Sequence, residues 1–160
     1  MPNMNWSIRP VISQDIPALK EVIDSSELFP SEMLDDMIAG YLSPAESNDV
    51  WLTVEEAGTP IAVAYCAPEM MTEGTSNLYL IAVSKPYQGK GVGGAVMDHL
   101  EELLRQSGVR VLIVETSGLP DFERTRQFYL QKDYHQEAVI RDFYQEGEDK
   151  VVFWKKLLPK

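Results

Sequence analysis

The stretch Val83–Leu100, VSKPYQGKGVGGAVMDHL, decides the fold, because it joins a strand to a helix through a glycine-rich loop. The apolar run at 77–83, NLYLIAV, precedes it. The first N–H groups of a helix have no partner within the helix, and the helix dipole adds about half a positive charge there. Glycine lets the backbone approach an anion without a side chain in the way. The stretch therefore predicts an anion-binding loop, with a pyrophosphate as its ligand.

The flanking hydropathy pattern predicts the order strand, helix, helix, strand, strand, strand, helix, strand, helix, strand, strand. These elements are expected at 6–9, 13–26, 30–42, two strands within 50–71 turning at 58–60, 77–83, 92–108, 109–115, 122–133, and two strands within 137–157 turning near 147. The continuous apolar run at 109–115 is typical of a strand buried on both faces. A helix joins it to the strand at 77–83, so these two strands are expected to be parallel. The pattern predicts one α/β domain with a mixed sheet.

Composition narrows the class of protein. The chain has 160 residues, a formal net charge of −11, one cysteine and two histidines. Such acidity argues against a nucleic-acid binder and leaves room for a cationic partner. No apolar run is long enough to span a membrane, no metal-ligand spacing appears, and one cysteine fits a reducing, cytoplasmic setting. Cys66 is expected to be buried, and His99 to pack within the stripe of its helix.

Two frames fit the glycines. Gly89, Gly91 and Gly94 satisfy the dinucleotide fingerprint G-x-G-x-x-G, and Glu115 ends the next strand about 20 residues later, where a ribose-binding acid would lie. This frame predicts a nicotinamide-dependent oxidoreductase. Against it, the segment 84–88 separates the strand from the first glycine, and the chain supplies too few further strand–helix units. This alternative stays open at the level of sequence.

The second frame is Gln88, Gly91 and Gly93, which supply the pattern Q/R-x-x-G-x-G/A. With the preceding strand and the leucine-rich helix, this segment resembles the acetyl-CoA-binding core of the GCN5-related N-acetyltransferases (GNAT family). Within that family the chain is similar to the RimI-like, protein N-terminal acetyltransferases. The resemblance implies a single domain over residues 1–160. It also implies a central, mostly antiparallel mixed sheet of about seven strands with a splayed parallel pair, and about four helices.

The resemblance implies acetyl-CoA as the acyl donor and no metal. The acceptor would be a small-molecule amine or the amine of a peptide or protein, attacking the thioester directly in a ternary complex; a homodimer is compatible with the family. By the same resemblance, a strand edge would pair with the pantetheine arm, and the loop N–H groups would wrap the pyrophosphate. The implied cofactor-binding residues are Ile81, Ala82 and Val83 on the strand and Gln88, Gly89, Lys90, Gly91, Val92, Gly93 and Gly94 in the loop.

Amide formation needs a base for the amine proton and an acid for the departing thiolate. Glu115 follows an apolar run at a strand end, where α/β sheets place their sites, and is the expected base; capping or a structural ion pair is the alternative. Glu69 and Glu73 are weaker candidates. By resemblance Tyr129 is the expected acid, with a packing role as the alternative, although Asp133-Tyr134 stands where the family usually has Gly-Phe.

The closing segment at 140–157 resembles the final hairpin of the same relatives, and this implies that Tyr144 lines the acceptor groove. A third alternative is a binding module that keeps the acetyl-CoA site without turnover. It predicts an intact glycine loop with a dispensable Tyr129 and Glu115. The sequence does not identify the acceptor.

Overall fold

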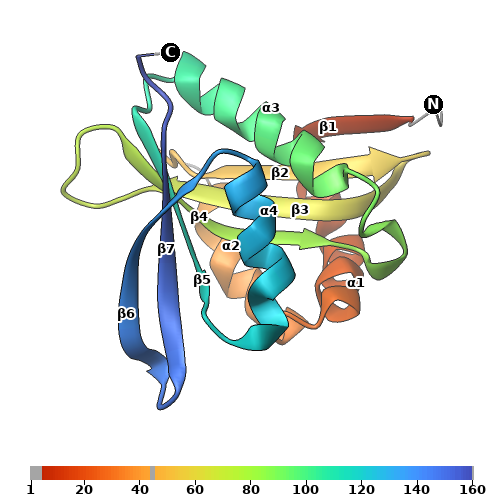
Figure 1. Cartoon of the computed structure of the whole chain (residues 1–160). Coiled ribbons are helices and arrows are strands. Elements are labelled where there is room, and N and C mark those ends of the chain that lie inside the picture. The colour runs from red at the N-terminus through yellow and green to blue at the C-terminus, as the bar shows by residue number, and fades with distance from the viewer. Residues whose placement is uncertain (1–4, 44–45, 160) are drawn as a thin grey trace. The chain divides into compact units, whose positions relative to one another are not determined.

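The computed structural model describes residues 5–43 and 46–159. Its strands form a seven-stranded sheet in the order β1-β2-β3-β4-β5-β7-β6. Four α-helices accompany them, in the element order that the hydropathy pattern predicts (Figure 1). The elements are β1 Trp6–Pro10, α1 Ile16–Ser26, α2 Leu34–Leu42, β2 Val50–Glu56, β3 Thr59–Pro68, β4 Thr75–Val83, α3 Val92–Gln106, β5 Val111–Ser117, α4 Glu123–Gln131, β6 His135–Gln145 and β7 Glu148–Lys156.

The sheet is mixed. β4 and β5 are parallel, with Thr75 opposite Val111 and Leu78 opposite Val114. The pairs β1–β2, β2–β3, β5–β7 and β6–β7 are antiparallel. A mixed, mostly antiparallel sheet with one parallel pair is therefore confirmed. The dinucleotide-binding alternative is wrong, because it requires a parallel sheet built from repeated strand–helix units.

The chain divides into two compact units. Unit 1 comprises Met1–Ala67 and Leu80–Glu102, and unit 2 comprises Pro68–Tyr79 and Leu103–Lys160. The boundaries fall at the end of β3, within β4 and within α3. The glycine loop between β4 and α3 therefore belongs to unit 1.

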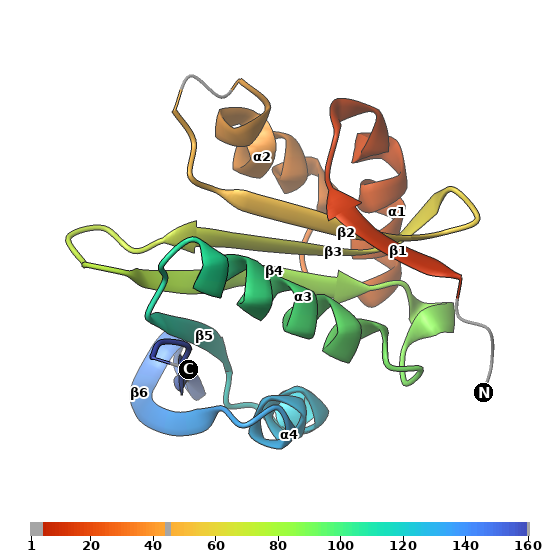
Figure 2. The same ribbon diagram turned by 90° about the horizontal axis from the view of Figure 1, so that it is seen from above.

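In unit 1, helices cover both faces of the strands. Figure 1 shows α3 above β2 and β3 with α1 and α2 below, and Figure 2 gives the same arrangement from above. Trp51 stacks on Tyr65 of the next strand at 4.2 Å between ring centroids. Four successive residues of β2, from Trp51 to Val54, are buried, as a strand covered on both faces requires. The core on the α1–α2 side contains Val11, Leu19, Val22, Ile23, Leu34, Ile38, Trp51, Val63, Leu80 and Ala82.

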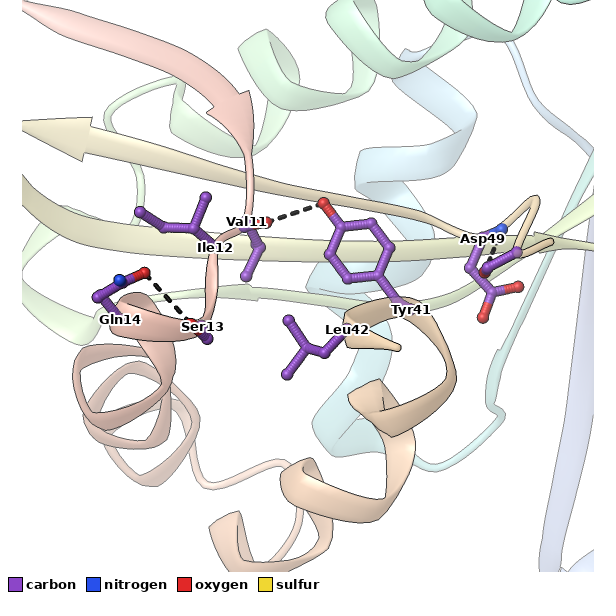
Figure 3. Close-up of a pocket in the computed structure, with 8 residues that line it drawn as sticks. Val11, Ile12, Ser13, Gln14, Tyr41, Leu42 and Asp49 are labelled. Carbon is purple, nitrogen blue, oxygen red and sulfur yellow. Dashed lines mark hydrogen bonds between the residues drawn. The ribbon is translucent and has the colours of Figure 1, made fainter. Parts of the chain in front are cut away.

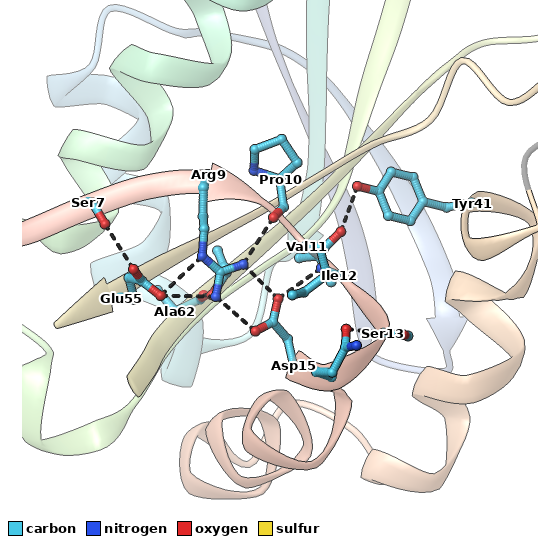
Figure 4. A network of polar contacts seen from close by, with 12 residues as sticks. Ser7, Arg9, Pro10, Val11, Ile12, Ser13, Asp15, Tyr41, Glu55 and Ala62 are labelled. Atoms are coloured by element: carbon cyan, nitrogen blue, oxygen red, sulfur yellow. Dashed lines mark hydrogen bonds and ion pairs between the residues drawn. The ribbon is translucent and has the colours of Figure 1, made fainter. Parts of the chain in front are cut away.

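An ionic network fixes the start of α1 against β1 and β2. Both guanidinium NH2 groups of Arg9 donate to the carboxylate of Asp15 at 2.8 Å, and its Nε donates to Glu55 at 3.0 Å (Figure 4). The bond from Arg9 lowers the pKa of Asp15, against the opposing effect of burial. A bidentate pair of this kind sets orientation as well as energy, so it positions the helix.

In unit 2, the strand register separates two faces. Residues that pair across strands share a face, so Asn77, Ile113 and Trp154 lie together. Glu115, two residues after Ile113, belongs to the same face. Phe153 points to the opposite face, and Tyr129 of α4 packs on it at 5.5 Å between ring centroids. The α4 helix therefore covers the face away from Glu115.

A wide bulge interrupts the pairing of β6 with β7. The register steps from Ile140 opposite Lys150 to Gln145 opposite Glu148, which leaves 141–144 facing the single residue Asp149. Asp142 has a φ of 53° in the left-handed region, and its N–H donates to Asp149 Oδ1 at 3.0 Å. Its own Oδ1 accepts from the N–H of Gly147 at 2.9 Å. The bulge therefore has an internal bonding scheme that redirects this part of β6.

Three details of the predicted fold are wrong. The β2–β3 turn consists of Ala57 and Gly58, both with positive φ, and Thr59 already pairs with Glu56. The residues of β5 alternate between buried and half-buried, so one face of that strand is more open than predicted. His99 is exposed rather than packed, because the buried stripe of α3 passes beside it. The buried position of Cys66 is confirmed.

Candidate active site

The glycine loop connects the end of β4 to α3 within unit 1. A short 3-10 turn at Lys85–Tyr87 leads into it, and Gly89 and Gly91 have φ of 76° and 88°. No atom outside the neighbouring residues lies within 4 Å of a Cβ built on either glycine, so backbone conformation rather than crowding demands glycine here. The carbonyl of Gly91 accepts the N–H of Ala95 at 3.0 Å, which begins the helical bonding.

Gln88, the first residue of the Gln88-x-x-Gly91-x-Gly93 frame, ties this loop to its strand. Its Nε2 donates to the carbonyl of Val83 at 2.9 Å, and its N–H donates to Lys85 at 3.2 Å. The side chain therefore braces the loop, while the N–H groups of the first α3 turn are the donors that a helix leaves for a ligand. Lys90, the cation of the loop, lies over the ring of Tyr87 at 5.8 Å. A loop of this form suits a phosphate group.

The strand end that precedes the loop carries Ile81, Ala82 and Val83. Ala82 is buried in the unit 1 core, and the other two are half-buried. The alternation fixes which side chains face the core. The pairing of β4 with β5 ends at Leu78, before this segment begins. The predicted cofactor-binding residues therefore lie on one continuous strand–loop–helix segment.

Glu115 lies in unit 2 among polar side chains. Its Oε2 forms an ion pair with the ammonium of Lys150, and its Oε1 accepts from Asn77 Nδ2 at 3.2 Å. The side chain of Lys150 is 12% exposed, and that of Glu115 26%. Lys150 Nζ also lies 4.0 Å from the centroid of the Phe143 ring, which the β6 bulge presents. Both oxygens of the predicted base are therefore engaged by donors.

A second carboxylate joins this cluster. Asn77 Nδ2 also donates to Glu69 Oε1 at 2.9 Å, and the hydroxyl of Tyr79 donates to the same oxygen at 2.6 Å. The bonds from Tyr79 and Asn77 lower the pKa of Glu69, the positive charge of Lys150 adds to the effect, and burial opposes it. We name Glu69, Asn77, Tyr79, Glu115 and Lys150 the carboxylate cluster.

Tyr129 occupies a different environment. It is 2% exposed, and its ring contacts those of Phe128, Tyr134 and Phe153 at centroid distances of 5.3, 5.7 and 5.5 Å. Burial raises the pKa of the Tyr129 hydroxyl well above its ordinary value. The hydroxyl therefore holds its proton throughout the physiological pH range, and the surrounding rings give Tyr129 a packing role.

Tyr144 lies in the β6 bulge and is 46% exposed. Its ring meets that of Phe143 edge-on at 5.1 Å between centroids. Partial burial raises its pKa, and the negative charges of Glu115 and Glu148 add to this. The contact that connects the bulge to the carboxylate cluster is that of the Lys150 ammonium with the Phe143 ring.

The predicted site residues are divided between the two units. The segment from Ile81 to Gly94 belongs to unit 1, whereas Glu115, Tyr129 and Tyr144 belong to unit 2. Within unit 2, Tyr129 lies on the opposite face of the sheet from Glu115. Sequence reasoning missed Asn77 and Lys150, although a polar residue opening the apolar run NLYLIAV was a visible signal.

A separate hollow of about 400 Å³ opens in unit 1 (Figure 3). The β1–α1 connection and the end of α2 line it, and Tyr41 donates to the carbonyl of Val11 at 2.8 Å across it. Its lining contains none of the predicted site residues: Val11, Ile12, Ser13, Gln14, Tyr41, Leu42, Ser47 and Asp49. Among the described residues, no group of three or more His, Cys, Asp or Glu side chains is placed to hold a metal ion. No described helix is long and apolar enough to cross a bilayer.

The chain is similar to known proteins in sequence and in fold. The family model "Acetyltransferase (GNAT) family" matches residues 16–146. An uncharacterized N-acetyltransferase of Methanocaldococcus jannaschii is 26% identical over 152 residues, which cover 93% of this chain and 90% of that protein. The range matched by the family model includes the glycine loop of unit 1 and all of the carboxylate cluster of unit 2 except Lys150.

Solved structures share the fold. A GNAT-family protein of Desulfovibrio desulfuricans has a TM-score of 0.90 and 28% identity, covering 95% of this chain and 99% of that one. The ribosomal-protein-S18-alanine N-acetyltransferase of Escherichia coli has a TM-score of 0.77 and 20% identity, covering 95% and 94%. A Salmonella typhimurium protein solved with its cofactor acetyl-CoA has a TM-score of 0.79 and 16% identity, covering 98% and 96%. This chain belongs to the GNAT family of acetyltransferases and is an N-acetyltransferase.

Proposed function

We propose that the protein transfers an acetyl group from acetyl-CoA to a primary amine by direct attack in a ternary complex. The observation that carries the donor side is the loop that Gln88 braces, with left-handed glycines ahead of the α3 N-terminus. Such a loop supplies convergent N–H groups to a pyrophosphate. The Salmonella typhimurium relative, solved with acetyl-CoA, supports the same donor.

In the proposed binding mode, the N–H groups of the Gln88–Gly94 loop bind the pyrophosphate. The backbone of Ile81–Val83 pairs with the pantetheine arm as an added strand would. Lys85 and Lys90 supply positive charge near the phosphates, which the acidic chain otherwise lacks. The family model matches residues 16–146, which include parts of both units.

In the proposed chemistry, the carboxylate of Glu115 accepts a proton from the acceptor ammonium, directly or through a water. Each of its oxygens has two lone pairs, so the bonds from Asn77 and Lys150 leave acceptor capacity. The neutral amine then attacks the thioester carbonyl carbon, and the C–S bond breaks. The nitrogen loses its second proton to solvent, and the Tyr129 hydroxyl gives its proton to the departing thiolate. Tyr129 then regains a proton from solvent and Glu115 releases its own, so the products are the N-acetyl amine, CoA thiol and one proton.

We propose a cationic acceptor, either a small-molecule amine or the amine of a peptide, with Tyr144 lining its groove. The net charge of −11 and the carboxylate cluster attract such a molecule at long range. The Escherichia coli relative acts on a ribosomal protein alanine, which supports a peptide amine as one acceptor class. The lone, buried Cys66 fits a reducing compartment, and we place the protein in the cytoplasm on that basis.

Release of free thiol from acetyl-CoA across a panel of amines and peptides tests this proposal. We expect acceptor-dependent release that falls in Tyr129→Phe and in Glu115→Gln. Tight binding of acetyl-CoA with no release for any acceptor would instead indicate a binding module. Full activity in Tyr129→Phe would remove the acid role from that residue.

A further inference from the structure

The two carboxylates of the cluster differ in what their oxygens do. Both oxygens of Glu115 are engaged, one by Asn77 and one by Lys150. In Glu69 the bonds from Asn77 and Tyr79 converge on Oε1. No described residue donates to its Oε2, although the bonds to Oε1 keep the group ionised. Glu69 is therefore a fixed negative charge with one oxygen available to a ligand.

The amide of Asn77 supplies an independent observation. Asn77 is 2% exposed, and its Nδ2 bonds to both carboxylates, so its side chain lies at the base of the cluster. Its Oδ1 is buried and accepts no hydrogen bond from any described residue. A buried acceptor without a partner is costly, so a further N–H donor that reached this amide would be favourable.

Charge defines the chemical class of that ligand. Glu69 and Glu115 contribute two negative charges and Lys150 one positive charge, so the cluster keeps an excess of negative charge. Lys150 already shows that an ammonium is accommodated here, against the carboxylate of Glu115 and the ring of Phe143. A second ammonium or a guanidinium matches the remaining negative charge and the available oxygen atoms.

We propose that Glu69, held by Asn77 and Tyr79, is a specificity-determining residue that binds a second positive charge on the acceptor, separate from the amine that is acetylated. The acceptor is then a diamine, or a peptide with a cationic residue next to its free N-terminus. This inference rests on the proposed acetyl transfer. It assigns to Glu69 a binding role and leaves proton transfer to Glu115.

Two matched pairs of acceptors test this role of Glu69. They also show whether the second positive charge belongs to a diamine or to a peptide. One pair is butane-1,4-diamine and butylamine; the other is a peptide with arginine at its second position and the same peptide with glutamine there. The preferred pair is the one whose doubly charged member the wild-type protein acetylates more efficiently. In Glu69→Gln, KM for that doubly charged member is expected to rise about tenfold, the effect of one lost charge-assisted contact. The kcat and the KM of the singly charged member stay unchanged. Glu69→Asp, which keeps the charge, restores part of the preference.

Glu73→Gln is the matched control, because Glu73 is an exposed carboxylate of the same β3–β4 connection outside the cluster. It is expected to leave both KM values unchanged. Equal changes of KM for both members of each pair in Glu69→Gln, or no change, would overturn the inference. So would an equal effect of Glu73→Gln, which would indicate general surface charge.

Binding without turnover separates this inference from the proposed function. Calorimetric titration with each acceptor, in the presence of saturating CoA and in its absence, gives affinities that need no chemistry. If wild-type protein releases no thiol, the proposed acetyl transfer fails. Binding of the dicationic acceptor that is about tenfold weaker in Glu69→Gln would still support the charge site. Equal binding by the two proteins would overturn it.

Discussion

Glu115 and Tyr129 lie on opposite faces of the same strands: Glu115 shares a face with Val152, whereas Tyr129 packs on Phe153, the next residue of β7. The two environments differ accordingly: Glu115 is half-buried beside Lys150, whereas Tyr129 is packed among aromatic rings. The two residues can therefore be tested separately.

Replacing Glu115, the proposed base, is expected to make the rate more dependent on solution pH. An alkyl ammonium has a pKa near ~10.4, so at pH 7 the acceptor must lose a proton before it attacks. In Glu115→Gln, we expect kcat/KM to fall about 100-fold at pH 7. This deficit should shrink as the solution pH approaches the pKa of the amine. Initial rates from pH 6 to 10 measure this. A deficit that stays constant over the whole range would contradict a role in deprotonation.

Gly91 tests the loop. With φ of 88°, alanine at this position is strained, so Gly91→Ala should disturb the N-terminus of α3 and raise KM for acetyl-CoA about tenfold or more. Gly108→Ala is the matched control, because Gly108 has φ of 86° after the C-terminus of α3, with equally open space around its Cβ. Both variants lose about 1 kcal/mol of stability. An equal rise of KM in both would show that strain, rather than ligand contact, is responsible.

The ion pair of Lys150 and Glu115 is expected to couple their contributions to stability. Lys150→Met leaves a half-buried carboxylate without its cation, which should cost about 1–3 kcal/mol, with the lower end favoured by the partial exposure of Glu115. Glu115→Gln in the same chain should recover part of that loss. Urea unfolding of the wild type, both single variants and the double variant measures the coupling. Additive losses would mean that the pair contributes nothing beyond its separate contacts.

Local and non-local parts of the site differ in how far sequence could predict them. The glycine loop is local: Gln88, Gly91 and the helix that follows are contiguous, and their spacing carries the geometry. The carboxylate cluster joins the β3–β4 connection, β4, β5 and β7, so its contacts depend on strand register, which a single sequence does not specify. Glu115 can be predicted as a candidate because it ends an apolar run, whereas Lys150 lies in a hairpin where lysine is ordinary.

The same reasoning explains the details that were wrong. The hydropathy pattern predicts His99 in the helix stripe because it is the neighbour of Leu100. One residue turns a helix by about 100°, however, which is enough to move a side chain from core to surface. The bulge at 141–144 has no simple sequence signature, since Asp142 adopts its positive φ through bonds to Asp149 and Gly147.

Asp133 explains one departure from the family pattern and offers a stabilising change. It has φ of 69°, at the place where glycine is usual, and Tyr134 after it is buried against Tyr129. Aspartate tolerates this conformation better than most residues, yet it still pays a backbone cost. Asp133→Gly is expected to raise the free energy of unfolding by about 0.5 kcal/mol. Urea unfolding checks this, and a loss of stability would mean that the aspartate side chain has a contact that outweighs the strain.

Burial of Tyr129 predicts how stability changes in alkali. Its pKa is raised in the folded protein, so above about pH 10, the ordinary value for tyrosine, the unfolded chain releases a proton that the folded chain retains. Stability is therefore unaffected by this group below that pH and falls above it, by about 1.4 kcal/mol per pH unit. Tyr129→Phe should remove this part of the slope, measured by urea unfolding from pH 8 to 11. Tyr144→Phe, at a half-exposed tyrosine, should change the slope less. An unchanged slope in Tyr129→Phe would mean that its hydroxyl ionises in the folded state.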